Sequence, residues 1–150
     1  MYNVMREIDG VAKLVQIGIR DMSEEEIEFG RAQGPRVSTH FDDTWAERLL
    51  RGEAFAALAE AALKELPETV YVSFDIDALE PALCPHTGTP VPGGLTFNQA
   101  VLILDTLRQS GRRVIGFDLV EVAPGPATEP ELDANVGARV LYKLCGTVTV

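Results

Sequence analysis

The sequence predicts an α/β fold in which a parallel sheet carries helices on both faces. Two observations predict this class. Apolar runs rich in β-branched residues alternate along the chain with segments whose apolar residues recur at helical intervals. The apolar runs are also nearly continuous, as is typical of strands that are covered on both faces. The chain has 150 residues, 46% of them hydrophobic, which suits one domain with its own core.

Four segments are expected to form strands. They read AKLVQIGI, RVSTHF, TVYVSFDI and RRVIGFDLVEV, and they cover residues 12–19, 36–41, 69–76 and 112–122. Valine, isoleucine, tyrosine and phenylalanine dominate these runs, and such residues fit the surface of a pleated sheet.

Four further segments are expected to form helices. They cover residues 23–33, 44–67, 96–110 and 131–145, and the second is expected to end at Pro67. Three hydroxyl residues stand where a helix cap is expected, namely Ser23, Thr44 and Thr96. For Thr44 and Thr96, the partner that a capping box requires follows three positions later, as Glu47 and Gln99. Pro130 suits the first turn of the last helix.

A long loop is expected over residues 78–94, with the sequence ALEPALCPHTGTPVPGG. It contains four prolines and three glycines, which rules out regular structure over most of its length. Loops of this length inside a compact domain are usually functional or disordered.

The bulk charge narrows the class of partner. The net charge is −10, from 23 acidic and 13 basic residues, so we expect neither nucleic acid nor an anionic membrane surface as a partner. No apolar run approaches the roughly 20 residues of a membrane helix. Cys84 and Cys145 lie far apart and no signal peptide is evident, which predicts reduced thiols and a cytoplasmic location.

The first candidate site is a pair of aspartates at the end of the third predicted strand. Asp75 and Asp77 are two positions apart in SFDIDALEP, so both side chains point to the same side of an extended chain, roughly 6.6 Å apart. Ligands of open α/β sheets bind at the carboxyl ends of the strands. A divalent cation would relieve the repulsion between the carboxylates and accept their hard oxygen ligands. The alternative is that one aspartate caps the loop backbone and the other is solvated.

A second candidate lies at the end of the fourth predicted strand. Asp118 and Glu121 interrupt the apolar run GFDLVEV, and Glu121 stands at its carboxyl end. A carboxylate there would suit a planar guanidinium, which donates two parallel hydrogen bonds. The alternative is an acid satisfied by backbone N–H groups or by an arginine.

The two histidines, His40 and His86, show no metal-ligand spacing. His86 follows Cys84 and Pro85 in the long loop and is a candidate to line a substrate site; the alternative is a loop residue with a backbone hydrogen bond. His40 is expected to be structural.

Together, SFDIDALEP, PHTGTPVPGGLT and GFDLVEVAP resemble the ureohydrolase family of arginases, agmatinases and related amidinohydrolases. The resemblance runs from about residue 12 to residue 145 and implies a three-layer α/β/α fold with a parallel sheet. It also implies two Mn²⁺ ions that activate water to attack a guanidinium carbon and release urea. Asp75 resembles the aspartate that bridges the metals, Asp77 the one that binds a single metal, and Glu121 the glutamate that holds the guanidinium.

The sequence also departs from the family pattern. The other four metal ligands of the family come from Gly-Gly-Asp-His and Asp-Ala-His-x-Asp stretches, and these 150 residues contain neither. The chain therefore resembles the C-terminal part of a single ureohydrolase domain, truncated at its N-terminus, and we expect an open strand edge and weak metal binding. The resemblance further implies a homo-oligomer, a trimer or hexamer. Agmatine, arginine, guanidinobutyrate and formiminoglutamate all stay open as substrates.

Two alternatives to a guanidino hydrolase remain. A phosphatase with an aspartate nucleophile also uses D-x-D, but it has threonine or valine two places on, where this chain has Leu79. A non-catalytic domain that keeps the fold as an assembly or binding surface would explain the missing ligands.

Overall fold

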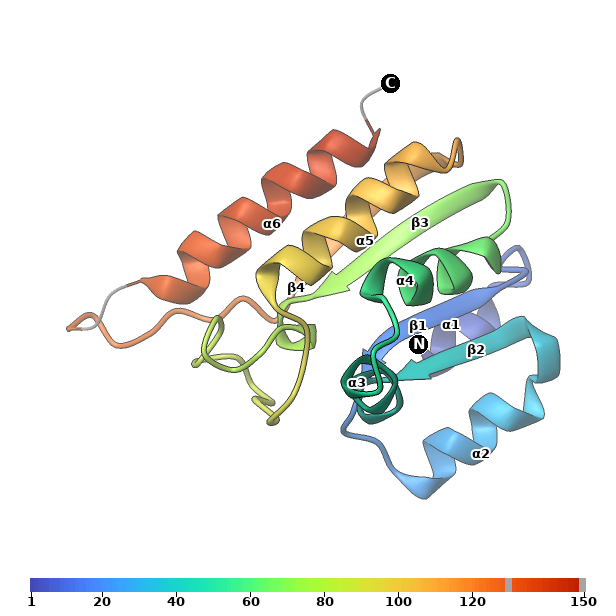
Figure 1. Ribbon diagram of the computed structural model, residues 1–150, viewed down its shortest axis with the longest axis horizontal. Coiled ribbons are helices and arrows are strands. Elements are labelled where there is room, and N and C mark those ends of the chain that lie inside the picture. Colours follow the sequence, from blue (N-terminus) through green and yellow to red (C-terminus); the bar gives the residue numbers. More distant parts are fainter. Residues whose placement is uncertain (129–130, 149–150) are drawn as a thin grey trace.

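The computed structural model describes residues 1–128 and 131–148, which form parallel strands with helices packed against them (Figure 1). The strands are β1 (Leu14–Ile19), β2 (Val37–Phe41), β3 (Thr69–Asp75) and β4 (Arg113–Val120). The α-helices are α1 (Tyr2–Glu7), α2 (Glu24–Ala32), α3 (Asp42–Leu50), α4 (Phe55–Lys64), α5 (Phe97–Gln109) and α6 (Leu132–Val148). Two 3₁₀ turns, η1 (Gly34–Arg36) and η2 (Ile76–Ala78), precede β2 and follow β3. The predicted α/β class is therefore confirmed.

The four strands form two parallel pairs and not one continuous sheet. β1 pairs with β2 and β3 pairs with β4, both in parallel. β1, β2 and β3 point the same way in Figure 1, and β4 pairs with β3 in parallel, so the carboxyl ends gather on one side of the molecule. The predicted parallel pairing is confirmed, but the prediction of one sheet is wrong, because the strands form two separate pairs. The described residues supply no strand that hydrogen-bonds the edge of β1 to the edge of β3.

The long helix predicted over residues 44–67 is wrong, because two helices occupy this stretch. Gly52 has a φ of 93°, in the left-handed region where glycine commonly ends a helix, and it separates α3 from α4. Thr44 is not a cap, since α3 begins two residues earlier and has Phe41 as its N-cap residue. The capping boxes at the starts of α2 and α5 are present. Pro130 lies outside the described residues.

The N-terminal helix α1 was not predicted. It has only six residues and buries a single side chain, Met5, so it carries no helical periodicity that a sequence could show. Its Tyr2 ring packs against Phe29 of α2 with 4.6 Å between the ring centroids. Among the described residues, no helix has the length and hydropathy needed to cross a membrane.

The main core lies between η2, α5 and α6, directly behind the carboxyl end of β3. Its buried members are Ile76, Leu79, Cys84, Leu95, Ala100, Leu104, Val136, Val140 and Leu144. Complete burial of an isoleucine or leucine side chain contributes about 1.5–3 kcal/mol. The core therefore fixes the start of the long loop, which is where the candidate carboxylates stand.

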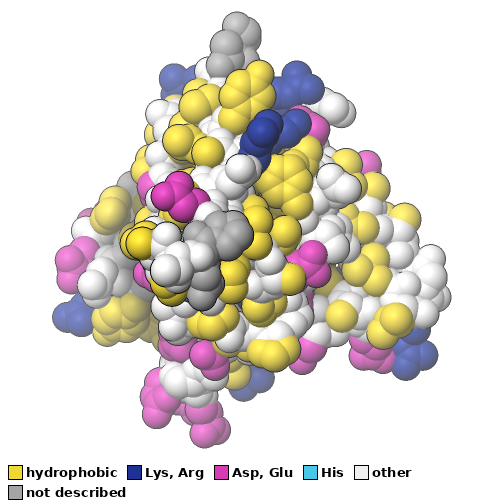
Figure 2. Space-filling view, turned by 90° about the vertical axis from the view of Figure 1, so that its left-hand side faces the viewer, with side chains coloured by type: hydrophobic (Ala, Val, Ile, Leu, Met, Phe, Trp, Pro, Cys, Tyr) yellow, Lys and Arg dark blue, Asp and Glu magenta, His cyan; other side chains and the backbone are white. Residues whose placement is uncertain are grey.

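The face on the left of Figure 1 carries many exposed apolar side chains, as Figure 2 shows. On α6, Leu132, Leu141 and Tyr142 are exposed, and Tyr142 keeps 77% of its surface accessible. Helix α6 thus buries one stripe in the core, and its exposed apolar side chains lie outside that stripe.

The long loop returns to its start through a close backbone approach at Gly94. Leu95 N–H donates to the Ala78 carbonyl and Glu80 N–H donates to the Leu95 carbonyl, both at 2.9 Å. A Cβ atom on Gly94 would lie 2.7 Å from the Leu79 carbonyl oxygen, and the φ of Gly94 is 94°. Only glycine fits there without moving the backbone.

We expect Gly94→Ala to lower the free energy of unfolding by about 3 kcal/mol or more, because it adds a backbone clash to left-handed strain. Gly52→Ala is the matched control: its φ is 93° and nothing lies within 4 Å of the added Cβ atom. The control should cost about 1 kcal/mol. Urea unfolding of both variants measures the difference, and equal losses would contradict the close approach.

Candidate active site

Asp75 and Asp77 both stand at the carboxyl end of β3, as predicted. Asp75 is the last residue of the strand, and its Oδ1 accepts a 3.0 Å hydrogen bond from the backbone N–H of Asp77. The Ile76 side chain between them is fully buried in the core, which fixes the turn η2. Asp75 therefore caps the turn, as the alternative interpretation proposed, and it also lies beside the second carboxylate.

The long loop contacts the second aspartate through Thr89. The Thr89 hydroxyl donates to Asp77 Oδ2 at 2.6 Å. Arg20, directly after β1, donates to the backbone carbonyls of Asp77, Leu79 and Val91, the last two at 3.1 Å. The ends of β1 and β3 and the loop are thus held together by a single guanidinium whose donors are used by carbonyl groups.

Glu121 follows the end of β4 in an unusual backbone conformation. Its φ is 62°, and among the described residues it is the one non-glycine residue with a positive φ. Such strain in a non-glycine residue is common at functional sites. A Cβ atom on Gly88 would lie 3.3 Å from Glu121 Oε2, so the carboxylate reaches the TGTP segment of the long loop.

The three carboxylates influence one another. Burial raises the pKa of Asp75 to about 6, the backbone N–H of Asp77 opposes this rise, and the negative charges of Asp77 and Glu121 add to it. The structure therefore brings together Asp75, Asp77 and Glu121 in one electrostatic environment. A cation that enters it is attracted by all three side chains.

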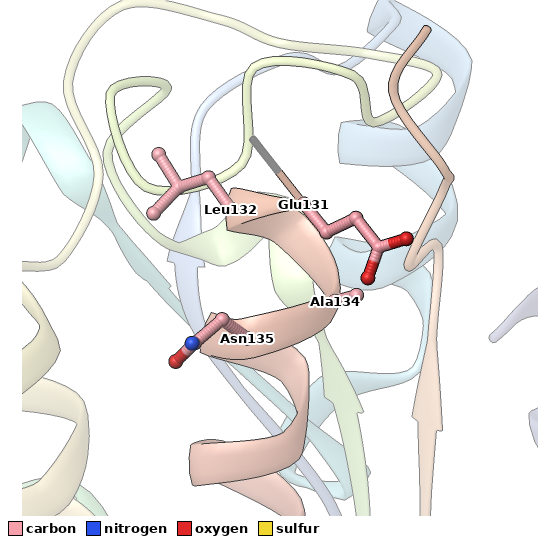
Figure 3. Close-up of a pocket in the computed structure, with 4 residues that line it drawn as sticks. All are labelled: Glu131, Leu132, Ala134 and Asn135. Atoms are coloured by element: carbon pink, nitrogen blue, oxygen red, sulfur yellow. The ribbon is translucent and has the colours of Figure 1, made fainter. Parts of the chain in front are cut away.

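A small hollow opens beside Asp77. It has a volume of about 180 Å³ and is lined by Gly18, Ile19, Arg20, Asp21, Asp77, Thr89 and Val91. A larger hollow of about 450 Å³ lies at the first turn of α6. Its lining comes from that one turn and includes none of the three candidate carboxylates. Figure 3 shows that its Glu131 and Asn135 side chains point to different sides of that helix. The hollow beside Asp77 therefore adjoins the candidate site.

The carboxylates of the described residues do not by themselves make a metal site. Within residues 1–128 and 131–148, no group of three or more histidine, cysteine, aspartate or glutamate side chains is placed to hold a metal ion. Asp75 and Asp77 have the hard oxygen ligands that Mn²⁺ accepts, but a dinuclear site needs more ligands than two carboxylates provide.

Comparisons with known proteins show the family to which the chain belongs. Residues 1–146 match the profile of the Arginase family. The chain belongs to this family. It is 33% identical over 137 residues to N(1)-aminopropylagmatine ureohydrolase of Thermus thermophilus. The matched region covers 89% of this chain and 41% of that protein. It is also 40% identical over 134 residues to the human mitochondrial guanidino acid hydrolase. That matched region covers 88% of this chain and 36% of the human protein.

The fold agrees as well. The structure of proclavaminate amidinohydrolase from Streptomyces clavuligerus superposes with a TM-score of 0.79 and 26% identity, over 98% of this chain and 46% of that one. The chain thus spans about two fifths of the length of the Arginase-family relatives it matches. This share is consistent with the predicted correspondence to the C-terminal part of the family's domain.

The structure directs His86 to a partner that sequence reasoning missed. Its backbone N–H and its Nδ1 both contact the carboxylate of Asp133 on α6, at 2.9 and 2.8 Å. That His86 lines the substrate site stays a prediction, and the alternative, a loop residue with a backbone hydrogen bond, is confirmed by its bond to Asp133.

Three residues of this Arginase-family site were not predicted: Arg20, Thr89 and Asp133. Thr89 lies in the TGTP motif. This motif belongs to one of the segments that resemble the family, so it could have pointed to Thr89. Arg20 and Asp133 gave none, because their partners lie 57 and 47 positions away in the sequence.

The raised pKa of Asp75 makes stability depend on pH. Its folded pKa, about 6, exceeds the ordinary 3.8, so the folded state holds the proton more tightly than the unfolded state does. The free energy of unfolding should therefore rise as pH falls from 7 through 6 toward 4. Asp75→Asn should flatten this dependence and stabilise the fold at pH 7 by about 1 kcal/mol, after allowance for solvent screening.

Chemical unfolding between pH 4 and pH 8 tests this expectation. Glu68→Gln is the control, because Glu68 is exposed and precedes the opposite end of β3. An Asp75→Asn variant that loses stability at pH 7 would contradict the crowding of the three carboxylates.

Proposed function

We propose that this chain forms the guanidinium-binding part, and a portion of the metal-binding part, of a hydrolase that releases urea or a related product from a guanidino compound. The observation that carries the proposal is the convergence of Asp75, Asp77 and Glu121 at the ends of β3 and β4. A carboxylate next to a strained backbone suits a planar cation that must be oriented before attack. The names of the relatives, which include ureohydrolases and amidinohydrolases, support the same reaction class.

Mn²⁺ is the proposed cofactor, with Asp75 and Asp77 as two of its ligands. The described residues do not complete the ligand set, so the remaining ligands must come from outside them. The relatives are more than twice as long as the matched region, which leaves room for such ligands in a longer protein. We accordingly place residues 1–150 in the C-terminal part of a single domain.

We propose a guanidino compound with a cationic tail, such as agmatine, as the substrate. The hollow beside Asp77 is lined by two acidic residues, Asp21 and Asp77, while its one arginine, Arg20, donates to backbone carbonyls. With two carboxylates against one guanidinium, the lining carries a net negative charge, which attracts an amine tail and repels a carboxylate tail. The net charge of −10 acts in the same direction at longer range.

We also propose that the protein is a homo-oligomer. The exposed apolar side chains of α6, Leu141 and Tyr142 among them, support association through this face.

Glu121→Gln should weaken agmatine binding at least about tenfold, since it removes the charge from a carboxylate that accepts two guanidinium hydrogen bonds. Asp118→Asn is the matched control. It removes the same charge from β4, but Asp118 accepts its hydrogen bond from Ser73 at 2.8 Å. Calorimetric titration of agmatine into both variants gives the two dissociation constants. Equal affinities of wild type and Glu121→Gln would reject the assignment of Glu121.

Mn²⁺ should bind the chain weakly, at about millimolar concentration, because two carboxylates make an incomplete site. The double variant Asp75→Asn, Asp77→Asn should abolish this binding. Calorimetry with Mn²⁺, run beside an assay of urea release from agmatine, measures both properties. Tight binding of two ions, or urea release by the chain alone, would show that the ligand set is complete within it.

A further inference from the structure

Asp133 is a buried carboxylate with a single described partner residue. It lies in the first turn of α6 and only 1% of its surface is exposed. Its Oδ1 accepts from the backbone N–H of His86 at 2.9 Å, and its Oδ2 lies 2.8 Å from His86 Nδ1. Both oxygens therefore bind the same residue, 47 positions away in the sequence.

The pairing is strong enough to keep the carboxylate charged. Burial alone would raise the pKa of Asp133, but the hydrogen bonds from the His86 ring and backbone outweigh burial and lower it. A buried charge that lost this partner would be costly, by several kcal/mol in typical proteins. The contact is thus a firm link between the long loop and α6.

The linked segment of the loop reaches the proposed guanidinium and metal carboxylates. Two residues after His86, a Cβ atom on Gly88 would lie 3.3 Å from Glu121 Oε2. The hydroxyl of the next residue, Thr89, donates to Asp77 Oδ2 at 2.6 Å. On the other side, a Cβ atom on Gly125 would lie 2.7 Å from His86 Cε1, so the ring also packs against the loop that follows Glu121. Four residues, 86–89, therefore touch α6, the loop after β4 and the end of β3.

We propose that His86 is a positioning residue: its contact with Asp133 sets the place of segment 86–89 against Glu121 and Asp77, and so the geometry in which the guanidinium is held. The inference rests on the proposed function, since Glu121 is taken as the guanidinium carboxylate. A displacement of about 1 Å at such a site is enough to cost a large factor in function.

Three variants separate positioning from simple stabilisation. His86→Asn keeps a side-chain donor near the place of Nδ1. His86→Phe keeps the ring volume against Gly125 but removes the donor and leaves Asp133 without this partner. The double variant His86→Phe, Asp133→Leu removes the buried charge as well, which should restore the stability of the fold without restoring the link.

Each variant is measured in three ways on the full chain: the urea midpoint of unfolding, the dissociation constant for agmatine, and the NMR positions of the Gly88 and Thr89 amide signals. His86→Asn should stay within about twofold of wild type in agmatine affinity. His86→Phe should bind about tenfold more weakly and shift both amide signals. The double variant should regain the unfolding midpoint yet keep the weak affinity and the shifted signals.

Recovery of agmatine affinity and amide positions in the double variant would overturn the proposal, because His86 would then act on stability alone. Unshifted Gly88 and Thr89 signals in His86→Phe would overturn it too. If wild type fails to bind agmatine, the proposed function fails, and the amide signals still decide whether His86 positions the segment.

Discussion

The site depends on a buried core that holds neighbouring carboxylates in place against their mutual repulsion. Asp75 and Asp77 flank Ile76, and the burial of Ile76 and Leu79 fixes the turn from which both acids project. Without that anchor the acids would move apart into water and lose their coupling. The core thus stabilises an arrangement that is unfavourable by itself. The pKa of Asp75 rises to about 6 because of burial first, and the negative charges of Asp77 and Glu121 add to that rise. A bound cation would offset it.

The second constraint is the division of the strands into two pairs. In a parallel sheet each strand normally hydrogen-bonds to neighbours on both edges, whereas β1 and β3 each have one described partner. Arg20, after β1, connects the two pairs instead by donating to the carbonyl groups of Leu79 and Val91. The long loop adds a hydrogen bond from the Gly94 N–H to the carboxylate of Asp42, after β2. Because the connection is made by a side chain and a loop, the carboxyl ends stay close together although the edges are not hydrogen-bonded to each other.

Local patterns predicted much of the fold, and non-local contacts explain the failures. The cap at Ser23 and the capping box at Thr96 depend on residues three positions away, so the sequence showed them. Thr44 and Glu47 have the same spacing, but α3 starts at Asp42, whose carboxylate accepts the N–H of Gly94 at 3.0 Å. That partner lies 52 positions away and overrode the local signal. The link from His86 to Asp133 was out of reach of local reasoning for the same reason.

One face of the β3–β4 pair is covered by helices, and the other face carries exposed side chains. α5 and α6 pack over one face (Figure 1), while Tyr71 and Ile115 keep 57% and 59% of their surfaces accessible on the strands. The polar groups there already satisfy one another: Asp118 accepts from Ser73, and a hydrogen bond with Asp118 raises the pKa of Tyr71. A further layer over this face would therefore gain from burying Tyr71 and Ile115 without having to satisfy Ser73 or Asp118. The family's three-layer architecture fits that requirement, because each parallel strand is then covered on both sides.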